Sequence, residues 1–93
     1  MFDIQKTTRF ERDVNRLARK NREVVTLYDN ALIVLKSDPY NISRQHRIKK
    51  LTDIKSGDGQ WRLTVGRYRI RYDIKGKIVE LHSFKPRPEA YRQ

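Results

Sequence analysis

The first half of the chain has apolar residues at helical spacing. Residues Phe2–Thr7 predict a short strand, and Thr8 with Glu11 fits a capping box at the start of a helix. Two runs then repeat apolar residues every three or four positions. The first run is Phe10, Val14, Leu17 and Ala18, and the second is Val24, Leu27, Tyr28, Ala31, Leu32 and Leu35. With Asn21 between the runs and Pro39 after them, the pattern predicts a helical hairpin with one apolar side.

The second half alternates apolar and polar residues, which is typical of strands. Trp61–Val65 and Tyr68–Ile74 alternate strictly, and Lys77–Phe84 is a third candidate. Arg47–Leu51 is either a further strand or a loosely ordered basic segment, and residues 86–93 are expected to be irregular. The order of elements predicts an α+β fold: an N-terminal strand, a helical hairpin, and then a three- to four-stranded antiparallel sheet.

Two predicted two-residue turns determine the register of the sheet. The turn at Gly66-Arg67 places Trp61 opposite Tyr72, and a turn at Lys75-Gly76 would place Tyr72 opposite Val79. Every side chain on this side of the three strands is then apolar. We therefore expect this face to pack under the helical hairpin.

The same register gathers basic side chains on the opposite face. Arg62 falls opposite Arg71, with Glu80 beside Arg71 and His82 beside Arg69. Like charges directly opposed in a sheet are unfavourable by roughly 0.2–1 kcal/mol, and one glutamate can offset only one of these arginines. Three convergent guanidinium groups indicate a phosphate site, because each group can donate a pair of hydrogen bonds to phosphate oxygens. The alternative is a solvated basic face with Arg–Glu pairs.

Composition supports a polyanionic partner. The 93 residues suit a single domain, 1–93, and contain 22 Lys and Arg against 11 Asp and Glu, a net charge of +11. Residues 44–93 hold 14 basic and 5 acidic residues, so +9 of this charge lies in that half. The lack of cysteine excludes disulfides and thiolate catalysis, and two histidines argue against a metal site. No apolar stretch of about 18 residues and no signal peptide is visible, which predicts a cytoplasmic protein without a membrane partner.

Several short motifs run along nearly the whole chain. They are Phe10-x-Arg12-Asp13, Leu35-x-x-Asp38-Pro39, Lys49-Lys50-Leu51, Trp61-Arg62-Leu63-x-Val65-Gly66-x-Tyr68-Arg69-Ile70-x-Tyr72 and Arg87-x-x-Ala90-Tyr91-Arg92. Together they resemble the RelE/ParE superfamily of toxins from toxin–antitoxin systems. The long block beginning at Trp61 is typical of the RelE branch.

The resemblance implies a RelE-like microbial ribonuclease-type fold and a specific activity. Such toxins cleave messenger RNA in the ribosomal A site and so inhibit translation. They use no metal or other cofactor, because the attacking group is the 2′-hydroxyl of the RNA itself. A cognate antitoxin with an acidic or amphipathic segment is the implied partner, in a toxin–antitoxin hetero-oligomer.

The resemblance also implies which residues act. By position, the catalytic residues would be Arg62, Arg69, Lys85 and Tyr91. Thr64 stands where RelE has a lysine, so the general base is open between His82, Glu80 and Lys49. A position beside Arg69 would favour the neutral imidazole of His82, which suits a base. Further RNA contacts are expected from Lys49, Lys50, Arg71 and Arg87.

Two other functions remain compatible with the sequence. A ParE-type inhibitor would act on DNA gyrase through protein contacts, and would not need convergent arginines on a sheet face. A catalytically inactive RNA-binding module would explain why Thr64 replaces the lysine. We expect the endoribonuclease because the arginines and the ending with Arg87 and Tyr91 fit it best.

Overall fold

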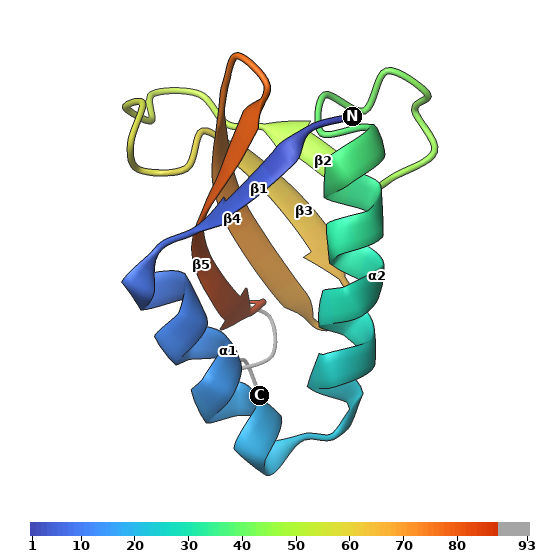
Figure 1. Ribbon diagram of the computed structural model, residues 1–93, viewed down its shortest axis with the longest axis vertical. Helices are drawn as coiled ribbons and strands as arrows, with labels where there is room; N and C mark the ends of the chain where they lie inside the picture. The colour runs from blue at the N-terminus through green and yellow to red at the C-terminus, as the bar shows by residue number, and fades with distance from the viewer. Residues whose placement is uncertain (88–93) are drawn as a thin grey trace.

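The computed structural model describes residues 1–87 and contains two helices and one sheet (Figure 1). In chain order the elements are β1 (Asp3–Lys6), α1 (Thr8–Lys20), α2 (Glu23–Ser37), β2 (Ile48–Lys50), β3 (Trp61–Val65), β4 (Tyr68–Lys75) and β5 (Ile78–Pro86). The two predicted helices are therefore present, and the segment around residues 47–51 forms a short strand. Neither helix of the described chain has the length and apolar character that crossing a bilayer requires.

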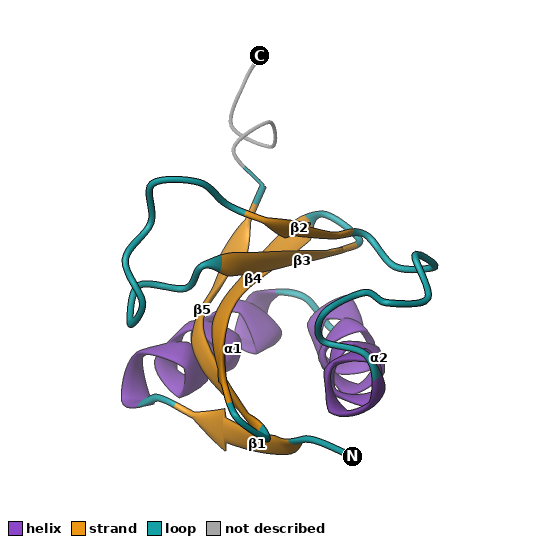
Figure 2. Ribbon diagram, turned by 90° about the horizontal axis from the view of Figure 1, so that it is seen from above, coloured by secondary structure: helices purple, strands orange, loops and turns teal. Residues whose placement is uncertain are grey.

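The sheet has five strands in the order β1-β5-β4-β3-β2. Strand β1 pairs parallel with β5, and every other pair is antiparallel. Figure 2 shows how strongly the sheet curves, with α2 on its concave side and α1 beside β5. The α+β class is confirmed, as are the four antiparallel strands after the hairpin, and the N-terminal strand joins them as a fifth, parallel strand. The helical hairpin carries the chain from β1 at one edge of the sheet to β2 at the other edge.

The start of α1 differs from the predicted capping box. Thr7, not Thr8, caps the helix: its Oγ1 accepts a hydrogen bond from the N–H of Phe10 at 3.1 Å. The same hydroxyl donates to the carbonyl of Leu81 at 2.8 Å. The cap therefore also ties α1 to β5. A capping pattern read from neighbouring residues cannot predict this contact, because Leu81 is far from Thr7 in the sequence.

The core lies between the helices and the apolar face of the sheet. Phe10 of α1 packs edge-on against Phe84 of β5, with ring centroids 6.1 Å apart, and also contacts Tyr28 of α2. The buried apolar residues are Phe10, Val24, Ala31, Leu35, Leu63, Tyr68, Ile70, Tyr72, Val79, Leu81 and Phe84. The prediction that one sheet face packs under the hairpin is confirmed.

Tyr72 is a buried member of this core that also makes a polar contact. Its hydroxyl donates to the carbonyl of Pro39 at 2.7 Å. Burial raises the pKa of Tyr72, and the charge of Asp38 raises it further. The phenol therefore stays protonated and fastens the segment after α2 to the sheet.

We expect Tyr72→Phe to lower the free energy of unfolding by about 1–2 kcal/mol, because the buried Pro39 carbonyl loses its donor. Chemical denaturation of both proteins measures this difference. Tyr40→Phe is the control, since Tyr40 is an exposed tyrosine. Equal stability of wild type and Tyr72→Phe would contradict the assigned contact.

The register between β3 and β4 is as predicted, whereas the one between β4 and β5 was predicted wrongly. Lys75 pairs with Ile78, so the turn is Gly76-Lys77, and Tyr72 pairs with Leu81 rather than Val79. A β-bulge between Arg71 and Tyr72 then shifts the pairing by one further residue. The apolar face survives because the turn displaces the partner strand by two residues, which keeps its inward side chains inward.

Candidate active site

Basic side chains form two rows across the outer face of the sheet. One row pairs Lys49 with Arg62, and Arg62 with Arg71, from β2 to β4. The next row pairs Thr64 with Arg69, and Arg69 with Lys85, from β3 to β5. Because directly opposed residues of neighbouring strands share one face, the rows place these side chains together.

The rows meet at a cavity of about 240 Å³. Five of its lining residues are cationic and none is acidic. The full lining is Arg9, Arg62, Arg69, Arg71, Ser83, Lys85 and Pro86. The sequence predicted that Arg62, Arg69 and Arg71 converge, and the structure brings them together, adding Arg9 from α1. Such a lining suits a phosphate group, which guanidinium groups bind in pairs of hydrogen bonds.

Arg71 is held in place by the loop before β3. Its Nε donates to the carbonyl of Gly59 at 2.8 Å, and its Nη2 donates to the carbonyl of Asp58 at 3.0 Å. Gly59 has a φ of +84°, and a Cβ there would lie 2.8 Å from the Cβ of Arg71. Glycine is therefore required for this close approach.

Asp73 holds the same loop from the other side. Its carboxylate is buried and accepts hydrogen bonds from the N–H groups of Gly57, Gly59 and Gln60, at 2.7, 3.1 and 2.9 Å. Burial alone would raise the pKa of Asp73, but these three donors and the charge of His82 outweigh it and lower the pKa. The loop is thus clamped between a carboxylate and a guanidinium group.

This clamp makes stability depend on pH. Because the folded pKa of Asp73 lies below the unfolded value of about 3.9, its contribution is complete above that value and is lost as pH falls through the folded pKa. Asp38 adds to the same loss, because hydrogen bonds from the Ser43 hydroxyl and nearby N–H groups lower its pKa too. We expect the unfolding temperature to drop below about pH 4. Thermal unfolding from pH 7 to pH 2.5 measures this drop, and a constant value would contradict it.

Lys85 is positioned by a buried carboxylate on α1. Its Nζ lies 3.0 Å from Oδ1 of Asp13, and Arg16 contacts the same oxygen at 3.1 Å. The other oxygen of Asp13 accepts a hydrogen bond from the N–H of Phe84 at 3.1 Å. Asp13 therefore fixes α1 against β5 and directs Lys85 toward the cavity. The sequence analysis assigned Asp13 no role.

The corrected register separates His82 and Glu80 from the arginines. Glu80 pairs with Asp73, not Arg71, and His82 lies at the bulge rather than beside Arg69. Nε2 of His82 is 2.9 Å from Oδ2 of Asp73 and 3.3 Å from Oε1 of Glu80. His82 therefore has two carboxylates as neighbours in place of the predicted Arg69.

This cluster is also the only group of potential metal ligands among residues 1–87. One ligand atom each from Asp73, Glu80 and His82 lies within 4.8 Å of the others. However, Oδ2 of Asp73 already accepts two backbone hydrogen bonds and contacts His82. These contacts show that the cluster holds the loop before β3 in place, which is a structural role.

The remaining predicted residues are spread over the molecule. Lys50 lies on the apolar side of the sheet, with its Nζ 5.5 Å from the centre of the Trp61 ring. Arg87 follows β5, where its N–H donates to the carbonyl of Arg67 at 2.8 Å. Tyr91 lies outside the described residues. Lys49 remains exposed on the basic face opposite Arg62.

No protein-family model and no curated protein matches the chain. Solved structures do match it. A chain of the toxin–antitoxin complex RelBE2 from Mycobacterium tuberculosis has a TM-score of 0.70 and 22% identity, over 92% of this chain and 98% of that chain. YafQ from E. coli has a TM-score of 0.70 and 16% identity, over 98% and 99%. A chain of the E. coli DinJ–YafQ complex has a TM-score of 0.71 and 17% identity over the full length of both. The chain therefore has the fold of RelE-like toxins, as the sequence resemblance predicted.

Proposed function

We propose that this chain is the toxin of a toxin–antitoxin module and cleaves messenger RNA on the ribosome without a metal. The observation that carries the proposal is the cavity lined by four arginines and a lysine. It lies on a fold shared with a chain of a toxin–antitoxin complex. A gyrase inhibitor that acts through protein contacts has no need for such a cavity.

The chemistry required is a phosphoryl transfer within the RNA. The 2′-hydroxyl attacks the adjacent phosphorus, a new bond from the 2′-oxygen to phosphorus forms, and the bond from phosphorus to the 5′-oxygen breaks. One proton leaves the 2′-hydroxyl and one is delivered to the departing 5′-oxygen. The products are a 2′,3′-cyclic phosphate and a 5′-hydroxyl. The protein must orient the strand, move two protons and stabilise the negative charge that grows on the phosphate.

The cavity residues fit the electrostatic part of this task. Arg62 and Arg69 would donate to the non-bridging oxygens of the scissile phosphate, and Lys85 would add a charge fixed by Asp13. Arg71, held by the loop, would contact a neighbouring phosphate. Tyr91 would stack on a base or orient the 2′-hydroxyl.

Among the three candidate bases, Lys49 is the one we favour. None of the three lines the cavity, but Lys49 shares a cross-strand row with Arg62, which does, whereas His82 contacts Asp73 and Glu80. Like the role of Tyr91, this assignment is a proposal that substitution tests. Lys49→Ala should lower the single-turnover cleavage rate more than either His82→Ala or Glu80→Ala.

We also propose an antitoxin as partner. An acidic or amphipathic segment would complement the basic sheet face and exclude RNA from it. The segment would fold on this surface in a hetero-oligomer. Competition between RNA and the antitoxin for the purified protein tests this point.

The deciding experiment adds the purified protein to translating ribosomes and, in parallel, to gyrase. We expect cleaved message with 5′-hydroxyl ends and unaffected DNA supercoiling. An Arg62→Ala/Arg69→Ala protein is the control for cleavage by a contaminating nuclease. Intact message together with blocked supercoiling would overturn the proposal in favour of gyrase inhibition. RNA binding without cleavage would favour an inactive RNA-binding module.

A further inference from the structure

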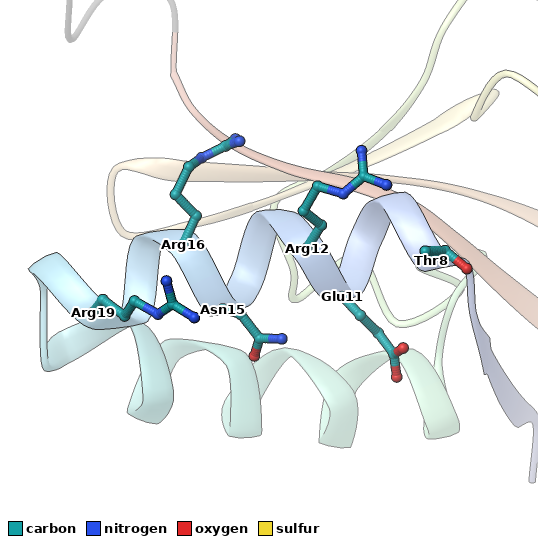
Figure 3. A pocket seen from close by; sticks show the side chains of 6 residues that line it. All are labelled: Thr8, Glu11, Arg12, Asn15, Arg16 and Arg19. Carbon is teal, nitrogen blue, oxygen red and sulfur yellow. The ribbon is translucent and has the colours of Figure 1, made fainter.

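The outer face of α1 carries a hollow of about 570 Å³ that the proposed function does not use (Figure 3). Its lining is wholly polar: Thr8, Glu11, Arg12, Asn15, Arg16 and Arg19. Figure 3 shows Arg12 and Arg16 leaving the helix on one side, while Glu11 and Asn15 leave it on the other.

Four arginines make one stripe along this helix. Arg9, Arg12, Arg16 and Arg19 are spaced three or four residues apart and are all exposed. At 3.6 residues per turn they fall within an arc of about 80°, and they span about 15 Å along the axis. We call these four residues the α1 arginine stripe.

The stripe connects to the cavity at two points. Arg9 lines the cavity itself, together with Arg62, Arg69 and Lys85. Asp13 provides the second connection, because its Oδ1 contacts both Lys85 of the cavity and Arg16 of the stripe. The stripe therefore adjoins the basic sheet face at Arg9 directly and at Arg16 through Asp13.

An ordinary solvated helix face does not explain the stripe. Its neighbours at three or four residues repel one another, which weakens a helix. Only Arg16 has a carboxylate partner among the contacts described for the stripe. Glu11 borders the hollow on the side of α1 opposite Arg12 and Arg16, and the stripe itself contains no acidic residue. This uniform row of arginines indicates an anionic ligand.

The chemistry of the hollow favours RNA over a protein segment. An amphipathic peptide needs apolar contacts to anchor it, and this hollow offers no apolar side chain. A phosphate backbone needs only donors at regular spacing. We propose that the RNA strand occupying the cavity continues over the α1 arginine stripe, which binds its flanking phosphates. The inference rests on the proposed function, since it takes RNA as the ligand of the cavity.

The experiment measures binding of 2′-O-methyl RNA, which lacks the attacking hydroxyl and stays intact. Labelled oligonucleotides of three and twelve nucleotides are titrated with wild-type protein and with Arg12→Gln/Arg16→Gln/Arg19→Gln. We expect the triple variant to bind the twelve-nucleotide RNA about tenfold more weakly, and the three-nucleotide RNA equally well. The slope of log affinity against log salt should become shallower by about 2 for the long RNA, since three phosphate contacts are lost.

Two matched proteins accompany this titration. Lys36→Gln/Lys55→Gln/Lys77→Gln removes the same charge from exposed positions elsewhere and should bind the long RNA nearly as well as wild type. Arg12→Gln/Arg19→Gln keeps the pair of Arg16 with Asp13, so it tests the stripe even if the triple variant fails to fold.

Three results would overturn the inference. One is that the triple lysine control loses as much affinity for the long RNA as the triple arginine variant does. A second is that the triple arginine variant binds the short and the long RNA more weakly by the same factor. The third is unchanged RNA binding with lost binding of polyglutamate, which would assign the stripe to an acidic protein. The ribosome and gyrase assay tests the proposed function separately. If wild-type protein binds long RNA through the α1 arginine stripe but cuts no message, the nuclease proposal is refuted and the inference about the stripe still holds.

Discussion

Replacing Arg69 with alanine should lower the rate of message cleavage by about 10²–10³-fold, as removal of one donor to a developing oxyanion does. Arg69 lines the cavity and pairs across the strands with Thr64 on one side and Lys85 on the other, so its guanidinium group lies near the centre of the basic rows. Its removal takes one donor from the proposed phosphate site. Growth arrest in cells that express the variant should disappear.

The measurement is single-turnover cleavage on programmed ribosomes, with circular dichroism to show that the variant folds. Arg69→Lys is the informative comparison, because it keeps the charge but loses the planar pair of donors, and its rate should fall between wild type and Arg69→Ala. Arg67→Ala removes an exposed arginine two residues away and should leave the rate unchanged. Full toxicity of Arg69→Ala would refute the site.

The parts of the fold that the sequence predicts correctly are those governed by local spacing. The helical hairpin follows from the apolar stripes, and the β3–β4 register follows from one tight turn at Gly66, whose φ is +57°. Because that register alone places Arg62 opposite Arg71, the convergence of the arginines could be predicted.

The errors come from features that local spacing does not contain. The turn at Gly76-Lys77 displaces β5 by two residues from the predicted register, and the bulge beside Tyr72, which leaves no mark on an alternating pattern, displaces it by one more. Together they place Ser83 and Lys85 in the rows where Glu80 and His82 were expected. The corrections for Glu80 and His82 therefore both follow from the register between β4 and β5.

Asp13 and Asp73 were missed for a different reason. Both carboxylates are buried and accept hydrogen bonds from backbone N–H groups that are distant in sequence: Phe84 for Asp13, and the loop at residues 57–60 for Asp73. The nearest signal was the glycine-containing loop itself, because Gly57 and Gly59 have positive φ and expose their N–H groups to one acceptor. Both aspartates support a cavity cation, Lys85 or Arg71, rather than contact a ligand.

Because Asp73 holds the loop that positions Arg71, its substitution should have the second large effect, a loss of stability. Asp73→Asn should lower the free energy of unfolding by about 2–3 kcal/mol, because the amide loses the charge and one of the two acceptor oxygens that the three loop N–H groups share. For a domain of this size the unfolding temperature should fall by about 10–20 °C. Asp58→Asn makes the same charge change at an exposed position of the same loop and should be nearly neutral.

Asp73→Asn should also weaken RNA binding below its unfolding temperature, because the loop carbonyls of Asp58 and Gly59 that hold Arg71 are no longer fixed. Lowering the pH should act on the wild type in the same direction, so the stability gap between wild type and Asp73→Asn narrows below about pH 4, as the native carboxylate becomes protonated. Thermal unfolding of both proteins across that range measures the gap. A gap that stayed constant to pH 2.5 would show that the carboxylate charge of Asp73 does not hold the loop, and the positioning of Arg71 would then need another cause.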